Sequence, residues 1–474
     1  MRPDKPSASR LLSCALLAGA LLVVPACSAQ TQEPHAGAER SGAASTSAAP
    51  SSGDQQGQTA AVGDRGPSSG PWSVDDATWD AASQAVAEMT VEQKAGQVIV
   101  ATYNGADPES VDAHIQQIKD LHLGGVIVMG RNVPTSDGTG QTQEDTPLGG
   151  AQGVDVPAMT GYIKDFQSAL TRSHAGHEWS GIVSVDQEGG TVTRLGSPLT
   201  QWPVTADIGA ANDPQLTQEA AEGLASELAG LGFTMNNAPT ADVTAPGDAV
   251  IRDRSYGTDS AHVSEQVVAS VTGHHNAGVV SSVKHFPGHG SVTTDSHVGL
   301  PVQETAISEL EKKDWAPFRA AVEAGVPTVM MGHIAVSAWN PEVPATLEPA
   351  AYQALRDDVG FHGVVVTDAL DMGALAGIVG PGSPVDTGVS TPAGAALQAG
   401  ADVLLMPEDT AAAHADIVQA VESGAIPRER LDQAVTRVVA MQMRYDHLHK
   451  DLPVAPSTPG SHQDVVARID AAGE

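Results

Sequence analysis

The stretch GVVVTD, residues 363–368, places three valines and a threonine directly before an aspartate. Further short apolar runs lie along the chain: GQVIVATY (96–103), GGVIVMG (124–130), GIVSVD (181–186), FTMNNAP (233–239), VVSSVKHF (279–286), PTVMMGH (327–333) and ADVLLMP (401–407). Most are separated by stretches of helical period, such as SEQVVASVTGHHNAG. Continuous apolar strands alternating with helices indicate a parallel sheet covered on both faces. Eight such units predict an α/β fold, a (β/α)₈ TIM barrel, with a doubly wound open sheet as the alternative.

Composition limits the kinds of partner. The chain has 474 residues, and 57 acidic against 24 basic side chains give a formal net charge of −33. Such a charge argues against nucleic acid or an anionic membrane surface as the main partner. The length suits one large domain or two ordinary ones.

The N-terminus has the features of an export signal. Basic residues in the first ten positions precede the apolar run LLSCALLAGALLVVPA, which ends at Cys27. Val24-Pro-Ala-Cys27 resembles a bacterial lipobox, so residues 1–26 are predicted to be a lipoprotein signal peptide and Cys27 the lipidated residue. The alternative is a signal peptide that happens to contain a cysteine. The lipobox predicts an exported protein, lipid-anchored to the outer face of the cytoplasmic membrane.

The remaining chain divides by composition. Residues 27–71 are rich in Ser, Gly and Ala and are predicted to be a flexible linker. Residues 72–447 carry all the strand and helix patterns, and we expect them to form a single catalytic barrel domain. Residues 448–474 are predicted to be a polar, poorly ordered tail. Two long loops, 131–156 and 376–392, follow strands and are expected on the catalytic rim.

Polar side chains collect at the ends of the apolar runs. Asp186, Lys284, His285, His333 and Asp368 each come at the carboxyl end of a predicted strand. In a parallel barrel these ends share one rim, where active sites lie. Ordinary polarity at strand ends is the alternative, and five ionisable residues make it the weaker one.

The stretch KHFPGHGSVTTDSH, residues 284–297, holds three histidines and admits several interpretations. His285 and His289 have the spacing of a helical metal-binding pair, but Pro287-Gly288 makes a helix there unfavourable. The order of a phosphate-binding P-loop is absent. Asp295 precedes His297 by two positions and could orient its imidazole for acid–base catalysis. By itself this pair is better explained as a solvated turn.

Taken together, the motifs closely resemble those of bacterial glycoside hydrolase family 3, in its β-N-acetylglucosaminidase branch. The resemblance rests on KHFPGHGSVTTDSH, on DQEGG (186–190) running to Arg194-Leu195, on APTADV (238–243), on DRSYG (253–257) and on VVVTDALDMGAL (364–375). The order and spacing of these motifs agree from residue 90 to about residue 445. The insertion at 131–156 has no counterpart in this pattern.

The resemblance implies a role for each matching residue. Asp368 would be the nucleophile, His297 the acid/base and Asp295 its partner. Residues that would hold the hydroxyl groups of the terminal sugar are Asp186, Arg194, Arg254, Lys284 and His285. The implied activity is that of a retaining exo-β-N-acetylglucosaminidase acting on peptidoglycan fragments or chitooligosaccharides, with no metal or organic cofactor. We expect a monomer that binds GlcNAc-containing glycans, contacts a membrane only through its lipid anchor and binds no nucleic acid.

Other functions remain open from the sequence. A β-glucosidase or a GlcNAc phosphorylase of the same family is one alternative. A metal-dependent hydrolase using His285, His289 and His297 is another, and a non-catalytic sugar-binding lipoprotein is a third. His289 is expected to shape its loop and Glu188 to be a structural acceptor beneath the site. Asp371 could compete with Asp368 as the reactive carboxylate.

Overall fold

The computed structural model describes residues 66–67, 70–138, 150, 152–245, 250–292, 294–451 and 458–473. The predicted signal peptide (1–26), the lipidation site Cys27 and most of the predicted linker lie outside these residues, so all three stay predictions. Within the described part of the chain, no helix is both long enough and apolar enough to span a membrane.

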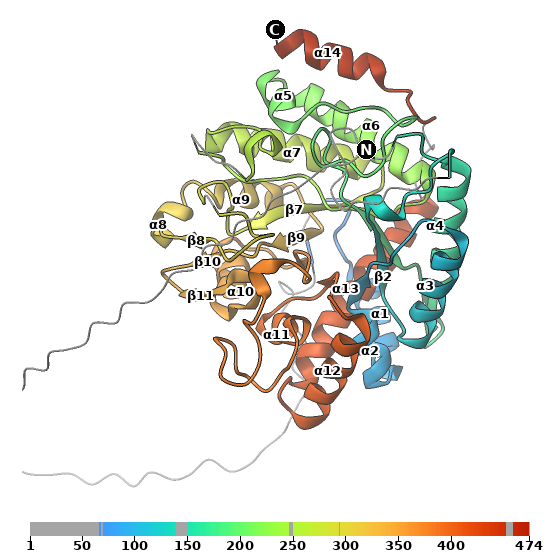
Figure 1. The fold of residues 1–474 in the computed structure, drawn as a ribbon, viewed down its shortest axis with the longest axis vertical. Coiled ribbons are helices and arrows are strands. Elements are labelled where there is room, and N and C mark those ends of the chain that lie inside the picture. The colour runs from blue at the N-terminus through green and yellow to red at the C-terminus, as the bar shows by residue number, and fades with distance from the viewer. Residues whose placement is uncertain are drawn as a thin grey trace, which may run out of the picture. The chain divides into compact units, whose positions relative to one another are not determined.

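Eight parallel strands form the centre of the fold (Figure 1). They are β1 (Ile99–Ala101), β2 (Gly125–Val128), β5 (Ile182–Val185), β6 (Met235–Asn236), β7 (Val280–Phe286), β9 (Thr328–Met331), β12 (Val364–Thr367) and β13 (Leu404–Leu405). Each lies within one of the eight predicted apolar runs. Neighbours pair in the order β12-β9-β7-β6-β5-β2-β1-β13. A parallel bridge between Val366 and Val403 brings the two end strands together, so the sheet is a nearly closed barrel. The TIM-barrel prediction is confirmed, and the open-sheet alternative is wrong.

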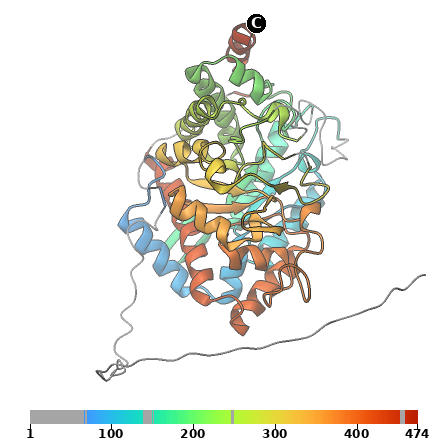
Figure 2. The same ribbon diagram turned by 90° about the vertical axis from the view of Figure 1, so that its left-hand side faces the viewer.

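Helices surround the barrel in the order expected of repeated β/α units (Figures 1 and 2). They are α1 (Asp76–Glu88), α2 (Val91–Gln97), α3 (Pro108–Asp120), α4 (Val156–Leu170), α5 (Thr205–Ala210), α6 (Pro214–Leu231), α7 (Ser260–Asn276), α8 (Ile307–Leu310), α9 (Ala316–Glu323), α10 (Pro349–Gln353), α11 (Pro392–Ala399), α12 (Thr410–Ser423), α13 (Arg428–Asp451) and α14 (Gln463–Gly473). Two small sheets accompany them: β3 (Arg172–His174) with β4 (His177–Trp179), and β8 (Val302–Gln303) with β10 (Ala335–Val336) and β11 (Asn340–Pro344).

Helix starts are fixed by short polar side chains. Aspartates 75, 107, 155, 213, 259 and 409 each cap a helix by accepting a hydrogen bond from a backbone N–H of the first turn. Thr90 and Gln93 form a capping box at the start of α2. Since the free N–H groups of a first turn need acceptors, these residues determine where each helix begins.

The strands bury side chains on both faces. One apolar cluster contains Val100, Ile127, Met235, Met330 and Val366, which come from five different strands of the barrel. A larger cluster contains alternate strand residues such as Ile99 and Val126 together with the helix faces. Because neighbouring residues of a strand point to opposite sides, these clusters are the barrel interior and the layer between barrel and helices.

The C-terminal segment corrects one prediction. Residues 448–474 were expected to be a poorly ordered tail, but α13 continues to Asp451 and α14 contacts α5 and α6. Val465 and Ile469 of α14 are buried. They are four residues apart and therefore share one helix face. The prediction was wrong because it rested on the polar composition of the whole segment, which these two apolar residues hardly change.

A buried carboxylate secures the closure of the barrel at its N-terminal end. Asp402, just before β13, is fully buried and lies within 3.3 Å of guanidinium nitrogens of Arg356, Arg430 and Arg437. Its Oδ2 also accepts the backbone N–H of Val365 in β12 at 3.1 Å. The Asp402 side chain thus links β12 and β13, the two strands between which the barrel closes, to α13.

Removing the charge of Asp402 should destabilise the fold. In Asp402→Asn, three guanidinium groups lose their buried anion, so we expect the free energy of unfolding to fall by about 3–5 kcal/mol in urea titrations. Asp432→Asn is the matched control, because Asp432 pairs with Lys94 at 2.6 Å while its side chain is 47 % exposed. That change should cost less than about 1 kcal/mol. Equal losses in the two variants would contradict the role given to Asp402.

Candidate active site

A cavity of about 270 Å³ opens at the carboxyl ends of the barrel strands. The predicted residues that line it are Asp186, Arg194, Arg254, Lys284, His285, His297 and Asp368. Asp295 is joined to this set through its contact with His297. Met129, Met372, Leu405 and Met406 supply an apolar part of the wall, and among the described lining residues there is no Phe, Tyr or Trp.

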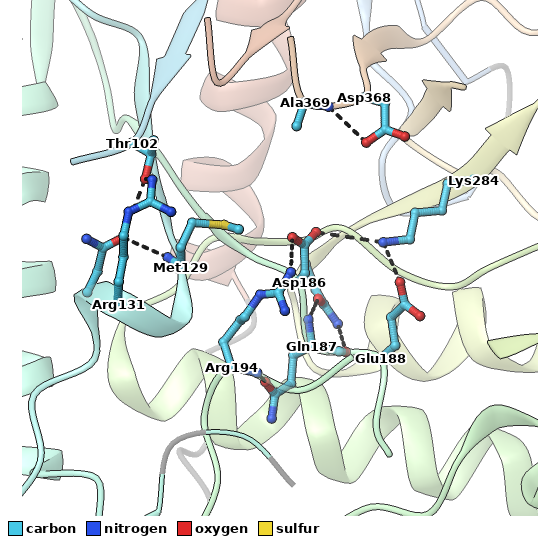
Figure 3. Close-up of polar contacts among 12 residues, drawn as sticks. Thr102, Met129, Arg131, Asp186, Gln187, Glu188, Arg194, Lys284, Asp368 and Ala369 are labelled. Atoms are coloured by element: carbon cyan, nitrogen blue, oxygen red, sulfur yellow. Dashed lines mark hydrogen bonds and ion pairs between the residues drawn. The ribbon is translucent and has the colours of Figure 1, made fainter. Parts of the chain in front are cut away.

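Lys284 lies between two carboxylates that follow β5 (Figure 3). Its Nζ is 2.6 Å from Glu188 Oε1 and 3.7 Å from Asp186 Oδ1. Arg194 Nη2 donates to the other oxygen of Asp186 at 3.2 Å. Asp186 is thereby held in the wall of the cavity, with its side chain 16 % exposed.

Glu188 connects this group to a second cation. Arg254, in the 3₁₀ turn η3 (Arg252–Arg254), donates from Nε to one oxygen of Glu188 and from Nη2 to the other, both at 2.9 Å. Burial raises the pKa of Glu188, but Arg254 and Lys284 outweigh it and hold that pKa well below its usual range. The expectation that Glu188 is an acceptor beneath the site agrees with these contacts.

His285 is oriented by a carboxylate that the sequence analysis did not select. Asp242 is fully buried, and its Oδ2 lies 2.7 Å from His285 Nδ1. Burial raises the pKa of Asp242, yet His285 and other donors bring it below the usual value. An ionised Asp242 accepts a hydrogen bond from the Nδ1–H of His285. The other ring nitrogen, His285 Nε2, then faces Arg254 Nη2, 3.5 Å away. The only signal for Asp242 in the sequence was its place at the end of APTADV.

Asp368 is positioned by the backbone at the end of β12. Its N–H donates to Met331 O at 2.9 Å, and its Oδ1 accepts the N–H of Ala369 at 2.8 Å. Burial raises the pKa of Asp368, but His285, His333 and other nearby donors lower it to about 2. The carboxylate is therefore ionised at neutral pH. His333 does not line the cavity and instead bonds to Thr346 Oγ1 at 2.7 Å and Ala369 O at 2.8 Å.

The pair Asp295 and His297 is formed, as the spacing allowed. Asp295 Oδ1 lies 2.8 Å from His297 Nδ1 and accepts the backbone N–H of His297 at 2.9 Å. Burial raises the pKa of Asp295, but these bonds from His297 lower it overall. The side chains are 48 % and 64 % exposed. The imidazole thus presents Nε2 while its other nitrogen is held by a carboxylate.

Of the remaining candidates, Glu188 and His289 also line the cavity, and the others lie elsewhere. No group of three or more His, Cys, Asp or Glu side chains in the described ranges is arranged to hold a metal ion. His274 is buried and bonds to Asn236 Nδ2 at 3.0 Å and Ser270 O at 2.9 Å, which fits a structural role. Asp371 is exposed and lines a separate cleft with Arg131.

The fold and the site together define a class of protein. A parallel β/α barrel with a cluster of carboxylates, cations and imidazoles on its carboxyl rim has the architecture of a barrel enzyme. Residues 90–441 match the family described as "Glycosyl hydrolase family 3 N terminal domain". The chain belongs to glycoside hydrolase family 3.

Several proteins of known name are similar to the chain. It is 32 % identical over 317 residues to "Beta-hexosaminidase A" of Pseudoalteromonas piscicida, covering 61 % of this chain and 52 % of that protein. It is 37 % identical over 232 residues to "Beta-hexosaminidase" of Stenotrophomonas maltophilia (strain R551-3), covering 48 % and 66 %. The solved family 3 beta-N-acetylglucosaminidase of Paenibacillus sp. str. FPU-7 aligns with a TM-score of 0.67 and 33 % identity, covering 81 % and 68 %. The chain thus spans between about half and two thirds of the length of each of these relatives.

The ion pairs of Glu188 should make stability depend on pH in a defined direction. Because the pKa of Glu188 is lowered by folding, its ionised form stabilises the protein above the unfolded pKa of about 4.3, and this contribution is lost as the pH falls. Glu188→Gln should therefore cost about 3–5 kcal/mol at neutral pH, and the difference from wild type should shrink below about pH 4. Urea titrations of wild type and variant, at neutral pH and below about pH 4, measure this difference in the free energy of unfolding.

A surface glutamate provides the control. Glu309 pairs with Lys312 at 2.7 Å with both side chains more than half exposed. Glu309→Gln should change the free energy of unfolding little at either pH. A loss in Glu188→Gln that stays constant with pH would contradict the assigned charge state.

Proposed function

We propose that the protein is a retaining exo-β-N-acetylglucosaminidase that removes terminal GlcNAc from peptidoglycan fragments or chitooligosaccharides. The observation that carries the proposal is that Asp368 and His297 open onto one cavity, although they come from different β/α units. The names of the relatives support the choice of sugar, since they are hexosaminidases and an N-acetylglucosaminidase.

In the first step, the carboxylate of Asp368 attacks the anomeric carbon. A C1–O bond to the enzyme forms while the glycosidic C1–O bond breaks, and His297 gives its proton to the departing oxygen. In the second step, His297 takes a proton from water, the water oxygen bonds to C1, and Asp368 leaves as a carboxylate. Two displacements at one carbon retain its configuration.

The charged residues around the cavity suit a single terminal sugar. Asp186 can accept hydrogen bonds from hydroxyl groups, and Arg194, Arg254 and Lys284 can donate to sugar oxygens. The cavity lies near the lower end of the usual range for small-molecule pockets, about 300 Å³. A pocket of this size favours cleavage from a chain end.

Most glycosidases use a second carboxylate as acid/base. Here the exposed imidazole of His297 takes that position, and Asp295 fixes its tautomer through the contact at Nδ1. The neighbouring carboxylate also stabilises the imidazolium form, which gives up its proton in the first step and is formed again in the second. The imidazole of His297 can therefore serve as the acid in the first step and as the base in the second.

Covalent trapping tests the nucleophile directly. A 5-fluoro β-GlcNAc donor with a good leaving group should label wild-type protein, and peptide mapping should place the label on Asp368. Asp368→Ala should lower kcat/KM on an aryl β-GlcNAc substrate by about 10⁴-fold or more, because the covalent step is lost.

Asp371→Ala is the matched control for this experiment. Asp371 is a carboxylate three positions further on that lines the separate cleft, so its removal should leave activity within about threefold of wild type. A label on Asp371, or retained activity in Asp368→Ala, would contradict the proposal. Formation of GlcNAc 1-phosphate in phosphate buffer would identify a phosphorylase instead.

We also propose that the mature protein is tethered to the outer face of the cytoplasmic membrane through Cys27. Wild-type protein expressed in a bacterium should fractionate with membranes and partition into detergent. The Cys27→Ala variant should appear in the aqueous fraction, because it lacks the thiol to which the lipid anchor would be attached. The control Cys14→Ala changes the other cysteine of the chain and should leave the membrane fraction unaltered.

A further inference from the structure

We infer that Ser296 is a positioning residue that fixes the Asp295–His297 pair over the cavity, by joining its loop to two separate parts of the barrel. The inference rests on the proposed function, since it concerns how His297 reaches the departing oxygen. It assigns a task to Ser296, His289 and Gly373, none of which makes or breaks a bond in the reaction.

The exposure of the loop changes abruptly at Ser296. Asp295 and His297 have side chains that are 48 % and 64 % exposed, whereas Ser296 between them is 3 % exposed. Val298, next along, is 83 % exposed. A small polar residue buried between exposed neighbours is the point at which this loop is attached to the protein.

The first attachment runs through the side chain of Ser296. His289 Nε2 lies 3.3 Å from Ser296 Oγ, and the His289 ring is 2 % exposed. The backbone N–H of His289 donates to Asp242 Oδ1 at 2.6 Å, and the other oxygen of Asp242 holds His285. One buried carboxylate thus orients a sugar-binding imidazole and, through His289, the loop that carries the acid/base.

The second attachment runs through the backbone. Ala374 N–H donates to Ser296 O at 3.1 Å, and Ala374 lies in the turn η6 (Gly373–Leu375) that follows the nucleophile. A methyl group added at Gly373 would lie 2.7 Å from His297 O. The absence of a side chain at Gly373 is therefore what lets the loop lie against this turn.

The two attachments link the acid/base to both β7 and β12, the strands that end in the sugar-binding residues and in the nucleophile. Catalytic groups misplaced by about 1 Å can lose about 10²-fold in rate. An exposed imidazole held only by Asp295 would sample many positions. Ser296 restricts it to those from which it can protonate an oxygen leaving C1.

The dependence on the leaving group tests this role. A GlcNAc disaccharide needs protonation as its bond breaks, whereas a 2,4-dinitrophenyl β-GlcNAc donor does not. Ser296→Ala should lower kcat for the disaccharide by about 10- to 100-fold and kcat for the dinitrophenyl donor by less than about threefold. KM should change little for either substrate. Gly373→Ala should give the same pattern while leaving the contact between Ser296 and His289 intact.

Ser291→Ala is the matched control, because Ser291 lies in the same loop and its hydroxyl accepts from Lys313 Nζ at 3.2 Å rather than joining the attachment. It should behave as wild type, and circular dichroism should show all variants folded. Equal losses on both substrates in Ser296→Ala, or no loss, would overturn the inference while the wild-type activity stands. A wild type inactive on both substrates would instead overturn the proposed function and this inference with it.

Discussion

The site depends on keeping two buried cations beside their carboxylates. Lys284 and Arg254 both bond to Glu188, and none of the three side chains is more than 17 % exposed. Isolated, each charge would be costly to bury, but here each lies against a charge of opposite sign. Lys284 has a second contact, to Asp186 in the cavity wall. The cluster thus converts the ends of β5 and β7 into a fixed polar surface facing the cavity.

Much of the fold could be predicted because the barrel repeats one local rule. Each buried strand appears as an uninterrupted apolar run, and the ionisable residue after it marks the catalytic rim. GVVVTD and GIVSVD therefore identified both a strand and a site residue. Strand lengths were less accessible: β6 and β13 have only two residues each, since pairing with neighbours decides where a strand ends.

What the sequence could not supply were contacts between distant segments. In the sequence, Asp242 was recognisable only as part of a motif, because its partner His285 lies in the distant strand β7. Nothing in the sequence distinguished the buried Ser296 from its exposed neighbours. The bond between Asp295 and His297 was predictable, because both partners lie in one turn. For α14, composition suggested a loose tail, and the apolar pair Val465 and Ile469 gained its meaning only against α5 and α6.

The wall of the cavity has a consequence for selectivity. Thioether and aliphatic side chains at Met129, Met372, Leu405 and Met406 adapt to many shapes, and no Phe, Tyr or Trp among the described lining residues offers a broad ring on which one face of a pyranose could stack. Discrimination between stereoisomers then falls to directional bonds from the fixed ions. Such a pocket tolerates variation in bulk, yet penalises strongly an epimer whose inverted hydroxyl leaves one of those ions without a partner.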